Sequence, residues 1–420
     1  MTTIRQLTTL DGLKEFVRIA ANAYPVFNAH SDEDQTAAAE RMQKTLASDP
    51  SMSIYGLFRR EQMVGGMRLH DFNMTMFSTR VKAGGIGMVA VNLLHKREHI
   101  AKELLSFYLK HYRDQGVNLA LLYPFRHEFY YQMGFGYGTP AQEFRIQPDS
   151  LPRGPSKAHI QYLSPEEDRE AIVDCYHRMV ARTHGLIEKN PADIRRLLDK
   201  PSHRIVGYKD GQEVNAYLVF ELKVLDENTN FIKQDILVKE FIYEYPVALT
   251  EIFTFLHTQF DQVDRIVFVT QDESFFFNFS DPRDGSDVIL PTVFHQTGKT
   301  GVGLMYRVID LNGLFDDLRE HNFAGVSTRL KLTLEDSFLP KNAGDYYIHF
   351  NQGLAQTVSE SDVDVSIKMN VAEFSAMILG VVDFRRLYHY GLAQIDDPEK
   401  VDLVTRTFHW PNKPVCMTDF

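Results

Sequence analysis

The pattern of apolar and polar positions predicts a regular run of helices and strands in the first 145 residues. A short strand is expected at Ile4–Thr8. Apolar residues spaced three and four apart predict helices over Leu10–Tyr24 and Asp32–Ser48. A β-hairpin is expected next, because Ile54–Phe58 and Met63–Phe72 flank the turn sequence RREQ.

The segment GGIGMVAVNLLHKREHIAKELL predicts a strand, a short basic loop and an amphipathic helix over Arg97–Arg113. The apolar run Val117–Tyr123 follows as a buried strand, so that the three elements form a βαβ crossover. A helix start presents free backbone N–H groups, which suit a phosphate. This loop, however, has no glycine between Val91 and Tyr112. The pattern alone therefore leaves two readings, an anion site or a strand and helix that only pack together.

A second copy of this arrangement follows a linker-like stretch rich in proline and glycine at Leu151–Lys157. Ile205–Val224 predicts a hairpin with an Asp-Gly turn, and a strand, a helix near Pro246–Gln259 and another strand come after it. Ile86 of the first copy corresponds to Ile236 of the second, an offset of 150 residues. The order and spacing predict two structural copies of one α/β unit.

The helix start of the second copy differs chemically from that of the first. It carries Glu240 and Glu244 nearby and Pro246 in the first turn. Carboxylates repel phosphate at this position, and proline lacks the N–H group that would bind it. We therefore expect the second copy to keep the architecture without an anion site.

The pattern changes after residue 303, where strands of period two are followed by a helix. The fold class is predicted to be α/β and α+β. Three domains are expected over residues 1–148, 149–303 and 304–420. The first two are the α/β copies and the third is an α+β domain.

Composition narrows the classes of function. The 420 residues are 44% hydrophobic and carry a formal charge of −11, and no stretch approaches the length of a membrane span. We expect a soluble cytoplasmic protein without nucleic acid as its main partner, since a phosphate backbone requires a basic face. Cys175 and Cys416 cannot form a disulfide framework or a zinc site, and no metal is expected. Cys175 is expected to be a small core residue.

The segment FYYQMGFGYG places aromatic residues and glycines past the carboxyl end of a central strand, where α/β sheets bind ligands. Alone, this cluster favours core packing. Together with the basic loop it resembles the GNAT acetyltransferases, whose coenzyme A loop and aromatic F-Y-x-x-x-G-F motif have this order. The residues that match the aromatic motif are Phe129, Tyr130, Gly134 and Phe135.

The resemblance implies acetyl-CoA as co-substrate and assigns its contacts. These are Met88, Val89 and Val91 on the strand, then Lys96, Arg97, Glu98, His99, Ile100 and Ala101 in the loop and first turn. Three positions depart from the family pattern: Leu93 replaces proline, Lys96 replaces glutamine or arginine, and His99 replaces glycine. The N–H donors survive these changes. His99 would either crowd the phosphates or, protonated, pair with them.

The whole chain is similar to the Eis family, which joins two GNAT domains, the second degenerate, to a sterol-carrier-like domain. The segments MYRVID, KMNVAEFSAMILG and PVCMTDF carry that similarity in the third domain. It implies direct acetyl transfer to a primary amine, with Tyr130 as general acid and the α-carboxylate of Phe420 assisting as base. Tyr24, Phe27 and Asp419 would line the acceptor cleft. The family also implies a homo-oligomer, commonly a hexamer.

Two other classes of function stay open at this stage. The chain could carry an acyl-CoA or an apolar ligand without turnover, or it could be a structural scaffold. The nature of the amine is open as well, because aminoglycosides, polyamines and protein lysines are all compatible with the sequence as substrates. The acidic balance favours a cationic substrate.

Overall fold

A computed structural model describes residues 2–24, 27–226 and 230–420. The chain divides into two compact units, which we call the first and second units. The first unit contains the chain up to Gly138, Leu304–Pro414 and Asp419–Phe420. The second contains Thr139–Gly303 and Val415–Thr418. Both units mix helices with β-sheets, which confirms the predicted fold class.

The main sheet of the first unit has seven strands in the order β1-β2-β3-β4-β5-β16-β6. The strands are β1 (Thr2–Gln6), β2 (Met52–Arg59), β3 (Gln62–Met76), β4 (Thr79–Val91), β5 (Leu119–Leu122), β6 (Gly136–Tyr137) and β16 (Met305–Val308). β4 and β5 are parallel, while their neighbours on either side are antiparallel. The predicted hairpin is confirmed, with Phe58 opposite Met63.

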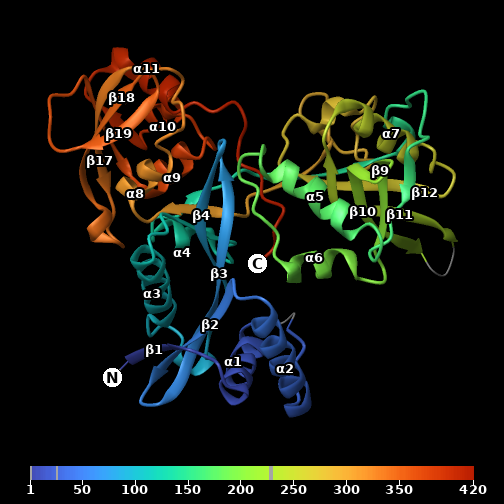
Figure 1. The fold of residues 1–420 in the computed structure, drawn as a ribbon, viewed down its shortest axis with the longest axis horizontal. Helices are drawn as coiled ribbons and strands as arrows, with labels where there is room; N and C mark the ends of the chain where they lie inside the picture. The colour runs from blue at the N-terminus through green and yellow to red at the C-terminus, as the bar shows by residue number, and fades with distance from the viewer. Residues whose placement is uncertain (1, 25–26, 227–229) are drawn as a thin grey trace. The chain divides into compact units, whose positions relative to one another are not determined.

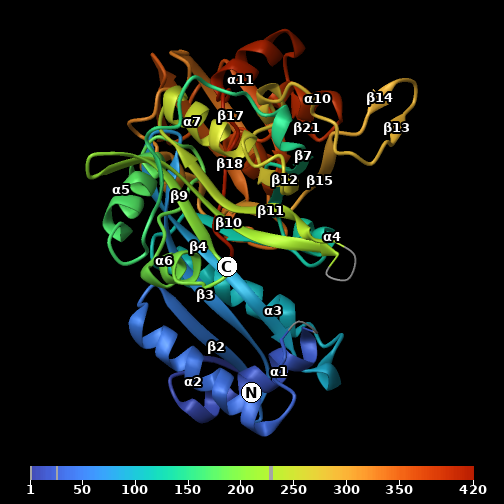
Figure 2. The ribbon, with the colours of Figure 1, turned by 90° about the vertical axis from the view of Figure 1, so that its right-hand side faces the viewer.

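Helices cover both faces of this sheet (Figures 1 and 2). α1 (Leu10–Ala23) and α2 (Asp32–Ser48) pack on one face in a cluster that includes Met63, and α3 (Ile100–Asp114) packs on the other in a cluster that includes Val64. Neighbouring residues of a strand point to opposite faces, so one strand contributes to both cores. The predicted helices and the βαβ crossover are confirmed.

The strand β16 lies between β5 and β6, although about 170 residues separate it from β6 in the chain. Met305 is opposite Leu122 on one side and Tyr137 on the other. This segment opens the third domain that the sequence predicts. Its four residues are all buried, and they pair with two strands of the first predicted domain.

Arg307 of β16 ties this sheet to the C-terminal domain. Its guanidinium is fully buried and donates hydrogen bonds of 2.8 and 2.6 Å to the two carboxylate oxygens of Asp336, as well as one to the carbonyl of Met133. A β-carbon on Gly134, whose φ is +82°, would lie only 1.6 Å from the Nη1 atom of Arg307. The glycine of the aromatic motif is therefore required by both its backbone angle and this close approach.

The C-terminal domain of the first unit has a five-stranded sheet of order β19-β18-β17-β20-β21. Its elements are α8 (Leu311–Asp317), β17 (Thr328–Glu335), β18 (Gly344–Asn351), β19 (Leu354–Val358), β20 (Val365–Asn370), α9 (Val371–Ile378), α10 (Phe384–His389), β21 (Ala393–Ile395) and α11 (Val401–Thr407). β17 alternates between buried and less buried residues along its length, as the period-two pattern predicts.

The second unit repeats the arrangement in a sheet of order β15-β7-β12-β11-β10-β9-β8. Its elements are β7 (Ala141–Ile146), β8 (Ile160–Tyr162), α5 (Arg169–Val180), α6 (Pro191–Leu198), β9 (Arg204–Asp210), β10 (Glu213–Asp226), β11 (Asn230–Tyr243), α7 (Pro246–His257), β12 (Val263–Thr270) and β15 (Gly298–Gly301). β11 and β12 are parallel, with Ile236 opposite Ile266, as β4 and β5 are with Ile86 opposite Leu122. The prediction of two copies is confirmed.

The acidic residues near the second copy's helix are paired with cations and do not present free negative charge at the helix start. Glu240 is buried and accepts hydrogen bonds from Lys189 at 2.5 Å and Tyr217 at 2.6 Å. Glu244 is paired with Arg178 at 2.5 Å. Cations therefore neutralise both carboxylates, and Pro246 in the first turn of α7 is the remaining feature that disfavours an anion there.

Candidate active site

The site begins where β4 extends beyond its parallel partner. The ladder pairs residues 83–86 of β4 with residues 119–122 of β5, and β4 then continues to Val91. On its other edge, two residues of β4, Met88 and Val89, stand opposite Met67 of β3 and form a β-bulge. Met88 has a φ of +47°. A bulge leaves a residue outside the regular ladder and turns its backbone groups away from the partner strand.

The loop after β4 forms an open helix start. A 3₁₀ turn at Leu93–His95 leads into α3, whose first intrahelical hydrogen bond runs from the Glu103 N–H to the His99 carbonyl at 3.0 Å. No side chain of the described residues caps this helix. The N–H groups of Ile100, Ala101 and Lys102 lie in the first turn. No preceding helical turn offers a carbonyl to accept their hydrogen bonds. Such groups suit an anion, so the loop fits a phosphate-bearing ligand.

His99 adopts the left-handed conformation, with φ +60° and ψ +15°. This is the region that glycine populates without strain and that other residues enter at about 1 kcal/mol or more. The position where the resemblance expects glycine therefore still has the backbone shape of a glycine. Lys96 and Arg97 beside it are exposed to solvent, and Arg97 also has a positive φ of 67°.

Arg59 holds this loop in place, and the sequence analysis did not identify it. Its guanidinium donates to Glu98 Oε2 at 2.6 Å, to the Glu98 carbonyl at 3.1 Å and to Glu103 Oε1 at 2.7 Å. His95 also lies 3.2 Å from Glu98. Arg59 neutralises the two carboxylates nearest the helix start, which would otherwise repel a phosphate. It lies at the end of β2, so no local sequence signal points to it.

Tyr130 lies on the short helix α4 (His127–Tyr131) and is buried. Its ring contacts those of Phe129 at 5.1 Å and Phe125 at 5.7 Å, both edge-on. Burial raises the pKa of the Tyr130 phenol well above its usual value, and the charge of Tyr24 adds to the shift. Tyr130 therefore keeps its proton at neutral pH.

Tyr24 connects the end of α1 with the bulge. Its hydroxyl donates a 2.8 Å hydrogen bond to the carbonyl of Val89, and burial raises its pKa. Tyr24, Phe27 and Met88 are half-buried and pack against the same apolar cluster under α1 and α2. The structure thus brings two predicted acceptor residues, Tyr24 and Phe27, next to the predicted strand contacts.

The C-terminal residue lies on β4. The Phe420 ring contacts those of Phe72 at 4.9 Å, Tyr123 at 5.2 Å and His70 at 5.7 Å. Its carboxyl carbon lies 3.0 Å from the position of an ideal β-carbon on Gly87, which directly precedes the bulge residue Met88.

Arg68 lies over the same glycine. Its Nη2 atom is 3.4 Å from the position of an ideal β-carbon on Gly87. The guanidinium and the α-carboxylate of Phe420 therefore both lie next to this glycine. The sequence offered no signal for Arg68. Asp419, the other predicted residue of the tail, is exposed.

The remaining candidate groups lie elsewhere. Cys175 of the second unit is fully buried, as expected of a small core residue, and burial raises the pKa of its thiol. None of the helices in the described residues is long and apolar enough to span a bilayer.

Comparisons with known proteins agree with this architecture. Residues 3–138 match an acetyltransferase (GNAT) domain family, and residues 179–308 match a second acetyltransferase (GNAT) domain family. The chain therefore contains two GNAT acetyltransferase domains. Residues 318–417 match a sterol carrier protein domain family. The predicted Eis-like arrangement of two GNAT domains and a sterol-carrier-like domain is confirmed.

The chain is similar to solved structures over its full length. A probable N-acyltransferase of Enterococcus faecalis is 18% identical with a TM-score of 0.79, and Eis1 of Mycobacterium abscessus is 18% identical with a TM-score of 0.77, each with 100% of both chains covered. A GCN5-related N-acetyltransferase of Anabaena variabilis is 14% identical with a TM-score of 0.79 and the same coverage. At such identities the likeness concerns the fold.

Among curated proteins, the chain resembles an uncharacterised N-acetyltransferase of Streptomyces coelicolor. The two are 27% identical over 176 residues, which are 39% of this chain and 43% of that protein. The chain thus covers less than half the length of this relative.

Proposed function

We propose that the first domain transfers an acetyl group from acetyl-CoA directly to a primary amine. The observation that carries this proposal is the meeting of three features on β4. The α-carboxylate of Phe420 lies at Gly87, the bulge begins at Met88, and Val89 packs against the apolar cluster that contains Tyr130. We propose that these groups supply the proton acceptor, the backbone donors and the protonated phenol of the reaction.

Acetyl-CoA supplies an activated thioester, and we propose that this chain holds it through two groups of residues. The backbone of Met88, Val89 and Val91 contacts the acyl and pantetheine end. The loop and first turn from Lys96 through Arg97, Glu98, His99 and Ile100 to Ala101 receive the phosphates. In this second group the N–H groups supply the directed contacts, and the exposed Lys96 and Arg97 supply positive charge. Glu98 contributes only its backbone, because its side chain is bound by Arg59.

The acid–base roles follow from charge. A primary amine has a pKa near 10.4 and arrives protonated, so it must lose a proton before its nitrogen can attack the acetyl carbon. We assign this proton to the α-carboxylate of Phe420, directly or through a water molecule. The C–N bond forms, the C–S bond breaks, and Tyr130 gives its proton to the leaving sulfur. The nitrogen then loses its second proton; of the two protons lost by the amine, one restores Tyr130 and the other is released to solvent, so the net products are the amide, the free thiol and one proton.

The acceptor is proposed to contact Tyr24, Phe27 and Asp419. The first two present aromatic surface beside the bulge, and Asp419 brings a carboxylate next to the terminal residue. Aromatic faces and a carboxylate suit a cationic amine.

A thiol-release assay with acetyl-CoA and a panel of amines tests this function. We expect release with at least one primary amine. Extending the C-terminus by a few residues should lower kcat by about tenfold or more, because the carboxylate moves off Gly87. Tyr130→Phe should lower kcat by about a hundredfold, whereas Tyr162→Phe, an exposed tyrosine of the second unit, should leave it unchanged. Binding of acetyl-CoA without release from any amine would support a carrier instead.

We also propose that the protein is a homo-oligomer, a hexamer by family resemblance. The hairpin of β13 (Ile289–Leu290) and β14 (Phe294–His295) in the second unit supports this proposal (Figure 2). It exposes a set of large apolar side chains, namely Val288, Ile289, Leu290, Val293 and Phe294. Contiguous apolar surface of this kind commonly marks a protein interface. Light scattering should show a smaller assembly for Val293→Ser/Phe294→Ser than for the wild type.

A further inference from the structure

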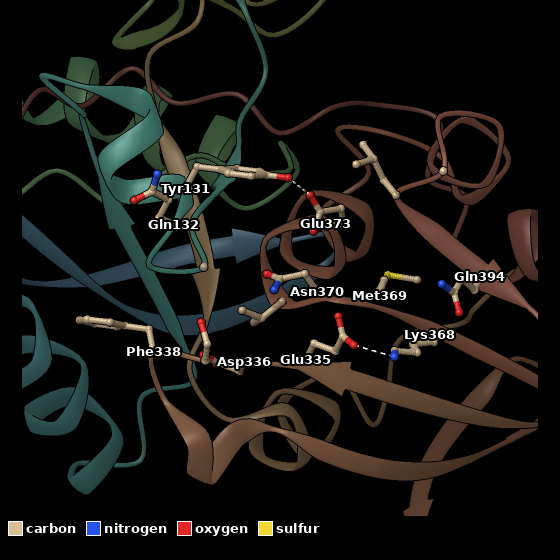
Figure 3. A pocket seen from close by; sticks show the side chains of 15 residues that line it. Tyr131, Gln132, Glu335, Asp336, Phe338, Lys368, Met369, Asn370, Glu373 and Gln394 are labelled. Atoms are coloured by element: carbon tan, nitrogen blue, oxygen red, sulfur yellow. Dashed lines mark hydrogen bonds and ion pairs between the residues drawn. The ribbon is translucent and has the colours of Figure 1, made fainter.

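A polar pocket of about 360 Å³ lies in the first unit between the end of α4 and the C-terminal domain (Figure 3). Its wall combines Tyr131 and Gln132 with the loop after β17 and with the junction of β20 and α9. The volume falls in the range of small-molecule sites. None of the residues that line it is among those proposed for acetyl transfer.

The charges around the pocket are partnered, with one exception. Asp336 is neutralised by the buried Arg307, and its oxygens also accept from the Leu339 N–H at 2.8 Å and the Asn342 amide at 3.2 Å. Glu335 pairs with Lys368 at 2.6 Å, and both side chains are about half exposed. Among the described residues that line the pocket, Glu373 is therefore the carboxylate without a cationic partner.

Glu373 is 94% buried, since only 6% of its surface is exposed. One of its oxygens accepts a hydrogen bond from the Tyr131 hydroxyl (Figure 3). Within the described part of the chain, the structure gives the other oxygen no partner. That oxygen is not fully enclosed by protein atoms, so it is open to the pocket. A buried carboxylate is expensive to leave half satisfied, and a cation is the natural complement.

We propose that this pocket binds a small hydrophilic ammonium compound, with its cationic nitrogen on Glu373. Asn370, Gln132 and Gln394 line the same space and provide amide groups for the polar parts of such a ligand. Tyr131 contributes its ring as part of the wall and orients the carboxylate through its hydroxyl. The Lys368–Glu335 pair lies at the more exposed side of the site, where Glu335 adds a second carboxylate to the lining.

Methyl NMR of the full-length protein with ¹³C-labelled methionine tests this site. Met369 lines the pocket and Met88 lies at the proposed acetyl-transfer site, so the two methyl groups report on different places. The resonances are assigned with Met369→Leu and Met88→Leu. Putrescine is the probe, and its uncharged analogue butanediol is the control. We expect putrescine at millimolar concentration to shift Met369, and butanediol to leave it in place.

Two variants with opposite expected effects keep the test independent of folding defects. Glu373→Gln preserves the size and the acceptor for Tyr131 but removes the charge, and it should weaken putrescine binding by at least about tenfold. Lys368→Met removes the competing cation and should tighten it. The proposal is overturned if Met369 fails to move, if butanediol moves it equally, or if neither variant changes the affinity. A shift of Met88 alone would place the amine at the acetyl-transfer site and would also overturn it.

Discussion

The carboxyl carbon of Phe420 lies 3.0 Å from the position that a β-carbon would take on Gly87. A methyl group there would press directly on the terminal carboxylate, because 3.0 Å is shorter than ordinary van der Waals contact. Gly87→Ala is therefore expected to displace the C-terminus and to lower kcat for acetyl transfer by about ten- to a hundredfold, since catalysis is sensitive to misplacements of 1 Å. Steady-state kinetics with a saturating amine would measure this.

Gly301→Ala is the matched control for that experiment. Gly301 also lies in a strand, but an added β-carbon would meet nothing within 4 Å. Its kcat should equal that of the wild type. If Gly87→Ala kept full activity while thermal stability was unchanged, the role of the terminal carboxylate would be wrong.

The left-handed backbone of His99 predicts a difference between two substitutions at that position. His99→Ala removes the imidazole and keeps the strain, whereas His99→Gly removes both. We expect the glycine variant to be more stable than the alanine variant by about 1 kcal/mol. It should also bind coenzyme A at least as tightly, because the first-turn N–H groups stay in place. Chemical denaturation and calorimetric titration check the two effects, and a more stable alanine variant would contradict the assignment of strain.

The buried pair of Arg307 and Asp336 predicts a large loss of stability for a single substitution. Arg307→Met would leave Asp336 as an unpaired charge in the interior, which costs about 3–5 kcal/mol. Arg307→Met/Asp336→Asn should recover part of this loss. Arg385 and Asp402 form an exposed pair at 2.7 Å, so Arg385→Met is the control and should change stability by less than about 1 kcal/mol. Urea denaturation of the full chain provides the comparison.

Buried tyrosines of α3 predict that stability falls at alkaline pH. The Tyr112 hydroxyl donates to the His70 carbonyl at 2.7 Å and to Asp71 at 2.9 Å, and burial raises its pKa far above the usual value. Below about pH 10 the tyrosine is protonated in both the folded and unfolded states, and its full contribution is present. Above that pH only the unfolded chain loses the proton, so the free energy of unfolding decreases by about 1.4 kcal/mol per pH unit for this group.

Denaturation between about pH 8 and pH 11 would measure this slope. Tyr112→Phe should reduce it, because one titrating group is removed. Tyr108, fully buried with its hydroxyl 2.7 Å from the Gly84 carbonyl, is expected to add to the wild-type slope in the same way. An unchanged slope in Tyr112→Phe would mean that other groups control the alkaline transition.

Hydrophobic periodicity predicted most elements of the fold, because the helices and strands of this chain are amphipathic and their apolar spacing is visible within each short segment of sequence. Asp32–Ser48 is a helix with the bounds expected from the sequence. α3 begins at Ile100 rather than Arg97, because a 3₁₀ turn and a left-handed residue intervene. The family motifs placed Tyr130 and the loop from Lys96 to Ala101 as candidate site residues, since those motifs are contiguous in the chain.

Contacts between residues far apart in the chain could not be predicted from hydrophobic periodicity or from local motifs. Arg59 holds Glu98 across 39 positions, and Arg307 meets Asp336 and Met133 from a strand that follows the second domain. Each of these contacts depends on which strands become neighbours in a sheet. The bulge at Met88 and the position of Arg68 over Gly87 are likewise set by strand register, which one sequence does not display.

The insertion of β16 between β5 and β6 has a consequence for biosynthesis. Residues 305–308 must leave the ribosome before the sheet of the first domain can be completed, so until then β5 and β6 are exposed edges. The second GNAT domain is made in the interval and can fold during it. The proposed active site is finished later still, when Phe420 reaches Gly87. Under the proposed mechanism, acetyl transfer by the N-terminal domain requires residue 420 to have been synthesised, and the unpaired edges of β5 and β6 need protection until β16 is in place.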